Sequence, residues 1–149
     1  MDVIATTEQV PGPGQTVYGK SFHTAPGGKG ANQAVQMARL GAQVTMCGKL
    51  GHDANGDEMR RTCEEAGIDT SCILYDDNAA SGCSVIILEE QPNGGTENRI
   101  LVVPGANMTI TPEDVAFLNL TSSCSSSRSR WRSTRSLQNM PTTRVCPSC

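Results

Sequence analysis

Aromatic residues and long apolar runs are scarce in this sequence of 149 residues. Only 3% of the residues are Phe, Trp or Tyr, and 37% are hydrophobic, both of which are low for a compact domain. No apolar run approaches the length of a membrane-spanning helix, so we expect no membrane partner. The first residues also lack the basic and apolar regions of a secretory signal, and we therefore expect a cytoplasmic protein.

Acidic residues are absent from the last part of the chain. Residues 121–149 hold five basic side chains and no acid, a net charge of +5, whereas residues 1–120 hold 15 acidic and seven basic side chains, a net charge of −8. The acidic body argues against nucleic-acid binding by the folded part. Serine and arginine dominate the tail, which can bury too little apolar surface to offset its ordering entropy. We expect a domain over 1–118 and a disordered tail over 119–149.

Metal-binding and nucleophilic residues form no recognisable cluster. His23 and His52 stand alone, without ligands at metal-binding spacing or a partnered nucleophile. Asp53 and Asp57 are better placed to cap a helix than to act as acid and base. Four cysteines of the body are widely spaced among apolar residues, and we expect free, buried thiols in a reducing compartment. They are Cys47, Cys63, Cys72 and Cys83.

Helical and strand-like patterns alternate through the middle of the chain. The predicted helices cover 31–40 and 55–66, and the predicted strands cover 44–47, 68–74, 83–88 and 98–103. Gly41 and Gly67 end the two helices, Gly48 ends the first strand, and residues 91–95 form a hairpin turn. Thr111 and the proline after it mark the start of a further helix. This alternation indicates an α/β layer fold with a smaller β element added to it.

The most informative stretch is the glycine-rich loop over residues 25–30, which is predicted to be irregular and to lead directly into a helix. Consecutive glycines let the backbone approach a ligand without an intervening Cβ, and the helix directs unpaired N–H groups at that ligand. Asn32 can donate and accept hydrogen bonds at once, as a sugar hydroxyl requires, and Lys29 adds a positive charge. The loop lacks the spacing of a P-loop. The alternative is a glycine-rich turn needed only for tight packing.

The run Gly-Gly-Lys-Gly-Ala-Asn-Gln-Ala at 27–34 resembles the N-terminal signature of the ribokinase (PfkB-type) carbohydrate kinases. The likeness extends through most of residues 2–118. Residues 10–16 resemble the family's approach to its lid, 48–56 resemble its next strand-to-helix turn, and 98–107 resemble its lid return. An eight-residue match with three ordered flanking matches is a specific signal.

The resemblance implies an α/β fold with a doubly wound sheet and a small β-sheet lid, whose segments would be about 3–24 and 83–103. In this family the Gly-Gly-Lys loop and the asparagine contact sugar hydroxyls. The resemblance therefore makes Gly27, Gly28, Lys29 and Asn32 candidate substrate-binding residues. Asp2 matches the aspartate that binds the sugar diol, although the strand before it is missing from this sequence. For Asp2 the alternative is a disordered terminus.

The resemblance also implies ATP-dependent phosphorylation of D-ribose or a similar sugar hydroxyl. It further implies Mg²⁺ and K⁺ as cofactors and a homodimer formed through the lid. The family's catalytic Gly-Ala-Gly-Asp type motif and its ATP-binding residues belong to the second half, and we find none of them in residues 108–149. We therefore find no catalytic residue, and we expect the incomplete N-terminal part of such a kinase, inactive on its own.

Three hypotheses for this chain remain open. In the first, a frameshift near residue 120 truncates a ribokinase-type sequence and makes the tail out-of-frame translation. In the second, the chain is a non-catalytic sugar-binding or dimerisation module. In the third, the Ser/Arg segment at 127–130 is a basic tail that binds RNA or a partner. Because an incomplete sheet leaves apolar faces and strand edges uncovered, we also expect the isolated chain to self-associate.

Overall fold

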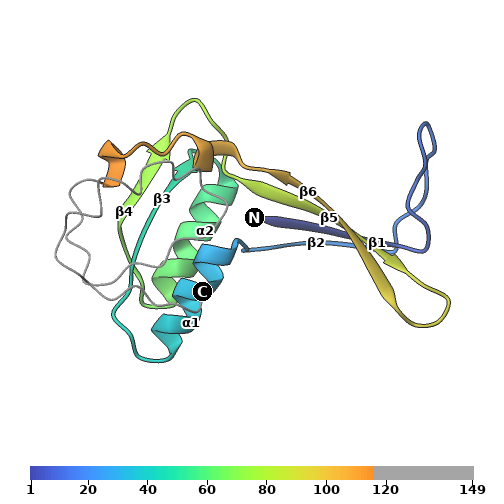
Figure 1. Ribbon diagram of the computed structural model, residues 1–149, viewed down its shortest axis with the longest axis horizontal. Helices are drawn as coiled ribbons and strands as arrows, with labels where there is room; N and C mark the ends of the chain where they lie inside the picture. Colours follow the sequence, from blue (N-terminus) through green and yellow to red (C-terminus); the bar gives the residue numbers. More distant parts are fainter. Residues whose placement is uncertain (116–149) are drawn as a thin grey trace.

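The chain folds into a body of helices and parallel strands from which a long sheet projects (Figure 1). The computed structural model describes residues 1–115. The end of the domain predicted at 118, the tail predicted over 119–149 and its proposed RNA-binding role lie outside the described residues. Within residues 1–115 no helix combines the length and apolar character needed to span a bilayer.

The projecting sheet has four strands in the order β2-β1-β5-β6. Their bounds are β1 Asp2–Thr7, β2 Ser21–Ala25, β5 Cys83–Glu90 and β6 Thr96–Val103. β1 is antiparallel to its neighbour β2 and parallel to its neighbour β5, and β5 and β6 form an antiparallel hairpin. The turn of that hairpin occupies 91–95 as predicted, with Gly94 at φ 81°. We refer to this four-stranded sheet as the lid.

The body contains two parallel strands, β3 (Thr45–Gly51) and β4 (Asp69–Asp76), and two helices, α1 (Lys29–Arg39) and α2 (Ala54–Glu65). Ala34 of α1, Cys63 of α2 and Ile68 form the buried core. Partly buried apolar residues pack around these three, namely Val35, Ala38, Val44, Met46 and Ala66. Met46 of β3 thus faces the helices, and both helices pack on the same side of the β3–β4 pair (Figure 1).

Element boundaries differ from the predicted ones by one or two residues at most ends, and by four residues at the end of β3. Helix α1 begins at Lys29, so the prediction of irregular backbone through residue 30 is wrong at its end; Gly28, at φ 96°, is the N-cap. Strand β3 does not end at Gly48, because Gly48 pairs with Ile73 and the ladder continues to Gly51. Pairing with the parallel strand β4 therefore keeps Gly48 within β3, although a glycine would weaken an isolated strand.

Helix α2 begins where the sequence placed its cap. The Asp53 carboxylate accepts a hydrogen bond from the Gly56 N–H at 2.8 Å, as the capping prediction requires. Gly41 and Gly67 follow the two helices with φ of 89° and 77°, the left-handed conformation typical of a helix end.

The cysteines are free, but they are not all buried. Of the four cysteines within residues 1–115, Cys63 is buried, whereas Cys47, Cys72 and Cys83 are partly exposed, so the expectation of buried thiols is wrong for these three. The expectation failed because each of the three lies on a strand of which one face is uncovered in the described part of the chain. Cys47 and Cys72, 25 positions apart in the sequence, are neighbours across β3 and β4.

Two chain segments connect the body to strands β5 and β6 of the lid, and a hydrogen bond joins these segments to each other. We call residues 79–82 and 104–107 the junction. The Ala106 N–H donates to the Ala80 carbonyl at 2.8 Å, which joins the outgoing and the returning segment. Ser81, 4% exposed, donates its N–H to the Asp53 carboxylate at 2.7 Å and accepts from the Gly51 N–H at 2.9 Å. The junction is therefore fastened to the start of α2.

From the returning segment of the junction onwards the chain forms two short 3₁₀ turns, η1 (Gly105–Met108) and η2 (Glu113–Val115). Thr111 and Asp114 cap each other, since the Thr111 N–H donates to the Asp114 carboxylate at 2.8 Å and the Asp114 N–H donates to the Thr111 hydroxyl at 3.4 Å. The predicted cap at Thr111 is thus present and opens a 3₁₀ turn, and the residues after 115, where the prediction continues, lie outside the described residues.

Candidate functional site

Asp2 and Gly27 are in direct contact, although 25 positions separate them in the sequence. Asp2 opens β1 and pairs with Ala25 of β2, and the chain then turns towards α1. At Gly27 this turn passes so close to Asp2 that a Cβ built on the glycine would lie 2.1 Å from the carboxylate oxygen Oδ2. Gly27 is also buried. Only glycine leaves room for the carboxylate at this position.

Gly28 makes the transition from the turn into the helix. Its φ of 96° is one that residues with a side chain rarely adopt, and nothing lies within 4 Å of where its Cβ would be. As N-cap it provides no side chain to bond the first-turn N–H groups of α1. The first turn, which contains Lys29 and Asn32, therefore presents uncapped N–H groups beside the Asp2–Gly27 contact.

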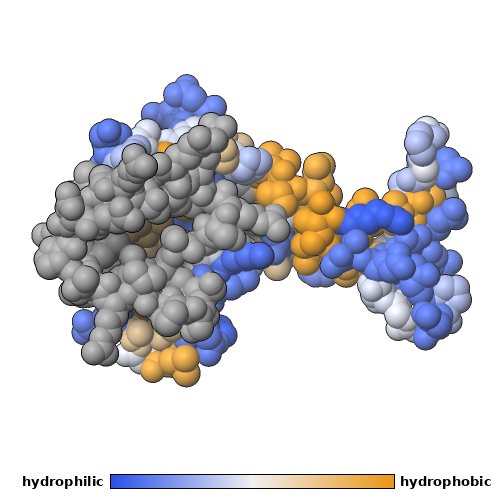
Figure 2. All heavy atoms as spheres, viewed as in Figure 1, coloured by the Kyte–Doolittle hydropathy of each residue, from blue (hydrophilic) through white to orange (hydrophobic). Residues whose placement is uncertain are grey.

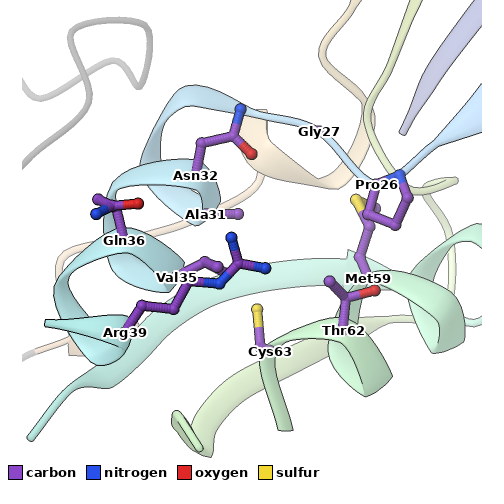
Figure 3. Close-up of a pocket in the computed structure, with 10 residues that line it drawn as sticks. All are labelled: Pro26, Gly27, Ala31, Asn32, Val35, Gln36, Arg39, Met59, Thr62 and Cys63. Carbon is purple, nitrogen blue, oxygen red and sulfur yellow. The ribbon is translucent and has the colours of Figure 1, made fainter. Parts of the chain in front are cut away.

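A pocket of about 370 Å³ lies between α1 and α2 (Figure 3). Gly27 and Asn32 form one end of it, and the Arg39 side chain reaches into the space between the helices. The complete lining is Pro26, Gly27, Ala31, Asn32, Val35, Gln36, Arg39, Met59, Thr62 and Cys63. Amide, hydroxyl and guanidinium groups from both helices face this space, and such groups can bond the hydroxyls of a small polar ligand.

The structure brings together part of the predicted site. Gly27 belongs both to the contact with Asp2 and to the pocket, and Asn32 lines the pocket. Asp2, Gly28 and Lys29 do not line it, and Gly28, Lys29 and Asn32 are exposed. Asp2 lies in a strand, so the alternative of a disordered terminus is wrong for this residue.

Sequence reasoning missed the contact between Asp53 and Ser81, which fastens the junction to the start of α2. Burial alone would raise the pKa of Asp53, but hydrogen bonds from Ser81 and Gly56 outweigh it and lower the pKa below the usual aspartate value. The sequence marked Asp53 only as a cap, and nothing in it marked Ser81. A contact between a loop and a helix cap 28 positions away has no local pattern.

A second polar cluster joins the returning segment to the ends of the parallel strands. The Lys49 ammonium lies 3.2 Å from the Asp114 carboxylate, and both side chains are largely covered. The Thr109 hydroxyl donates to the Asp76 carboxylate at 2.5 Å. This bond, followed by the N–H of Asn78, contributes most to lowering the pKa of Asp76. These four residues come from segments that are distant in the sequence, so no local pattern indicated that they meet.

Candidate metal ligands are not gathered in the described part of the chain. Across residues 1–115 no group of three or more His, Cys, Asp or Glu side chains could hold a metal ion. His52 instead stacks on Tyr75, with ring centroids 4.6 Å apart, and pairs with Asp77 on the surface.

Comparison with known proteins identifies the relatives of this chain. The family model described as "pfkB family carbohydrate kinase" matches residues 1–136, beyond the end at 118 that we predicted for the domain. The ribokinase of Bacillus subtilis is 46% identical over 112 residues, which cover 75% of this chain and 36% of that protein. The deoxyribokinase of Salmonella typhi is 37% identical and covers 77% of this chain and 36% of its own length. The chain thus spans little more than a third of these relatives.

Solved structures agree with the sequence relatives. The Arabidopsis thaliana ribokinase complexed with ribose and ATP superposes with a TM-score of 0.66 at 30% identity, covering 77% of this chain and 38% of that one. A ribokinase from Giardia lamblia reaches a TM-score of 0.67 at 32% identity. The matches in sequence and in structure agree, and the chain belongs to the pfkB family of carbohydrate kinases.

Proposed function

We propose that residues 1–115 form the sugar-binding part of a ribokinase-type enzyme that transfers a phosphoryl group from ATP to a hydroxyl of D-ribose or a similar sugar. The observation that carries this proposal is the contact between Asp2 and Gly27 at the N-terminus of α1. A carboxylate accepts hydrogen bonds from two neighbouring hydroxyls, and an uncapped helix start offers N–H donors beside it. These are the groups that a sugar diol needs.

Each candidate residue has a distinct task in this proposal. Asp2 accepts hydrogen bonds from the diol, and Gly27 with Gly28 lets the backbone approach the sugar ring. Asn32 both donates to and accepts from a further hydroxyl. Lys29 adds positive charge at the exposed start of the helix. The relatives named ribokinase and deoxyribokinase support a pentose, with or without its 2-hydroxyl, as the substrate.

We propose different tasks for the two faces of the lid. Asp2, Ser84 and Val102 are direct partners across three strands and therefore lie on the same face. We assign this face to the sugar. The next residue of each strand, Val3, Val85 and Leu101, lies on the opposite face, which is free to bind a second molecule.

The outer face of the lid supports a homodimer. Figure 2 shows apolar residues gathered on the lid where it leaves the body. On the outer face Leu101 of β6 is 65% exposed and Phe22 of β2 is 69% exposed, so large apolar side chains are uncovered at both edges of the sheet. A second copy of the chain placed on this face would remove both side chains from water.

ATP, Mg²⁺ and K⁺ belong to this proposal through the family, as does a cytoplasmic location. Another solved relative, the ribokinase of Cryptococcus neoformans, is in complex with ADP. Because residues 1–115 contain no cluster of three metal-binding side chains, we assign none of them to a metal. ATP supplies the phosphoryl group, and the described residues would hold and orient the hydroxyl that receives it.

Calorimetric titration of the purified chain with D-ribose and with 2-deoxy-D-ribose tests the proposal. We expect saturable binding that Asn32→Ala weakens about tenfold or more, since a bond to a bound hydroxyl is lost. Met37→Ala, on the same helix but exposed and outside the pocket lining, is the matched control and should change affinity far less. Absence of binding to both sugars would refute the proposal for this chain.

A coupled assay of ATP consumption with D-ribose, Mg²⁺ and K⁺ tests the catalytic part. We expect the chain to bind sugar without turnover, because no catalytic residue was found in it. Turnover that Asn32→Ala abolishes would contradict this expectation, and would instead place the phosphoryl-transfer groups within the chain itself.

A further inference from the structure

Two thiols of the body are neighbours across the parallel strands. Cys47 of β3 is the direct partner of Cys72 in β4. Neighbouring strands lie about 4.8 Å apart, and the Cα atoms of disulfide-bonded cysteines are usually about 4.4–6.8 Å apart. The spacing of the two backbones is therefore suited to a disulfide, although both thiols are free in this structure.

The two thiols share a face that the helices leave open. Met46 packs against the core below α1 and α2, and Cys47, the next residue of the strand, consequently faces the other side. Cys47 and Cys72 are both partly exposed. Small reagents can therefore reach the pair from the side opposite the two helices.

The sulfur atoms affect each other directly. Burial and then the neighbouring Cys72 thiol raise the pKa of Cys47 to about 11. The Ser71 hydroxyl lies 3.8 Å from the Cys72 sulfur, within hydrogen-bonding distance for sulfur. The two members of the pair thus differ: Cys47 is held protonated, and Cys72 has a hydroxyl beside it.

The strand is able to adjust at this point. The β3–β4 ladder shifts register between Thr45 and Cys47, and such an irregularity bends a strand and redirects its side chains. The small movement that brings the two sulfurs to bonding distance can be taken up there without unpairing Gly48 from Ile73.

We propose that Cys47 and Cys72 form a dithiol modification site that reacts with low-molecular-weight disulfides, such as oxidised glutathione, to give an interstrand disulfide between β3 and β4. Cys72 attacks one sulfur of the small disulfide, which forms a mixed disulfide and releases the first small thiol. The Cys47 sulfur then attacks the Cys72 sulfur of that mixed disulfide. The second small thiol leaves, and the two protons of the cysteines end on the two released thiols.

The other thiols of the described part are differently placed. Cys63 is buried in the core between the helices. Cys83 lies in the lid, where its direct partner in β6 is Val103. Neither has a cysteine as its strand partner, so within residues 1–115 the register singles out one pair.

The experiment uses the full chain with Cys124, Cys146 and Cys149 replaced by serine, so that tail thiols cannot exchange. The reduced protein is incubated with oxidised glutathione, quenched with acid, digested and mapped by mass spectrometry. We expect a cross-link between Cys47 and Cys72, with Cys63 and Cys83 remaining free. Closure requires the Cys47 thiolate, so its rate should rise with pH above pH 7.

Single variants separate the two steps. Cys47→Ser should accumulate the glutathione adduct on Cys72, because nothing displaces it, whereas Cys72→Ser should leave Cys47 nearly unmodified. The same chain unfolded in urea should lose this selectivity and serves as the folding control. A persistent adduct on Cys72 in the chain that retains both thiols would overturn the proposal, as would cross-links to Cys63 or Cys83 at comparable yield.

Discussion

The carboxylate of Asp2 occupies the space that a side chain on Gly27 would need. A Cβ there would lie 2.1 Å from Oδ2, and Asp2 would have to move. Because Asp2 also begins the pairing with β2, its position is defined by the sheet on one side and by the glycine on the other. The glycine-rich loop and the first strand therefore form one structural unit.

Replacing Gly27 by alanine tests this unit. We expect Gly27→Ala to displace the Asp2 carboxylate and to lower the affinity for D-ribose at least tenfold, measured by calorimetric titration. Gly48→Ala is the control, because nothing lies within 4 Å of the Cβ that it adds and its φ is not positive. Unchanged affinity in Gly27→Ala, with Gly48→Ala equally unaffected, would show that Asp2 takes no part in binding.

Removing the charge of Asp53 should destabilise the chain at neutral pH. Asp53→Asn weakens both the cap of α2 and the bond to Ser81, and we expect a loss of about 1–2 kcal/mol in the free energy of unfolding. Urea unfolding followed by circular dichroism measures it. Asp57→Asn, in the first turn of the same helix but exposed, is the control and should cost clearly less.

The effect of Asp53 should also depend on pH in a defined direction. Its pKa is lowered in the folded state, so the folded chain binds fewer protons than the unfolded chain in mild acid. The stabilisation is therefore complete above about pH 4–5, near the unfolded pKa, and is lost as the pH falls through the folded pKa. The difference between the original chain and Asp53→Asn should shrink from pH 6 to pH 3; a difference that grew would contradict the assigned cause.

The covered ion pair between Lys49 and Asp114 should contribute more than a pair at the surface. These side chains are 16% and 22% exposed, whereas Lys20, which pairs with Glu8 and Glu90, is 45% exposed. We expect Lys49→Met to cost about 1–2 kcal/mol of unfolding free energy and Lys20→Met to cost clearly less. Denaturant unfolding of both variants compares them, and equal costs would show that covering the pair adds nothing.

The two faces of the lid should respond differently to a charge. Leu101 and Ile100 are adjacent and both exposed, but they lie on opposite faces of β6. We expect Leu101→Asp to abolish self-association in sedimentation velocity, since it places a charge on the proposed dimer face. Ile100→Asp should leave association intact and weaken sugar binding. The reverse result would exchange the assignments of the two faces.

Local patterns in the sequence predicted local structure well. The caps at Asp53 and Thr111, the glycines after both helices and the hairpin turn at 91–95 all depend on a few adjacent residues, and each is present. The α/β class followed from the alternation of helical and strand-like periods, and the family followed from the run at 27–34.

Contacts between distant segments were beyond such patterns. Periodicity places a residue on a face of a strand, but it does not define which strand lies beside which. Cys47 and Cys72 therefore looked widely spaced in the sequence, although they are partners across β3 and β4. The end of β3 was misplaced for the same reason, because its partner strand and not its own propensity extends it through Gly48. Asp2 was assigned from resemblance, and its contact with Gly27 appears only in three dimensions.

A small rotation at the junction becomes a large displacement at the far end of the lid. Strand β5 has eight residues and so extends about 26 Å from Ser81, at a rise of about 3.3 Å per residue. A rotation of about 10° at the junction would move the far end of the strand by about 4–5 Å, which equals the spacing between two strands. The two hydrogen bonds that fasten Ser81 therefore help to determine where side chains at the far end of the lid lie. A small change of angle at Ser81 produces a large displacement at that end.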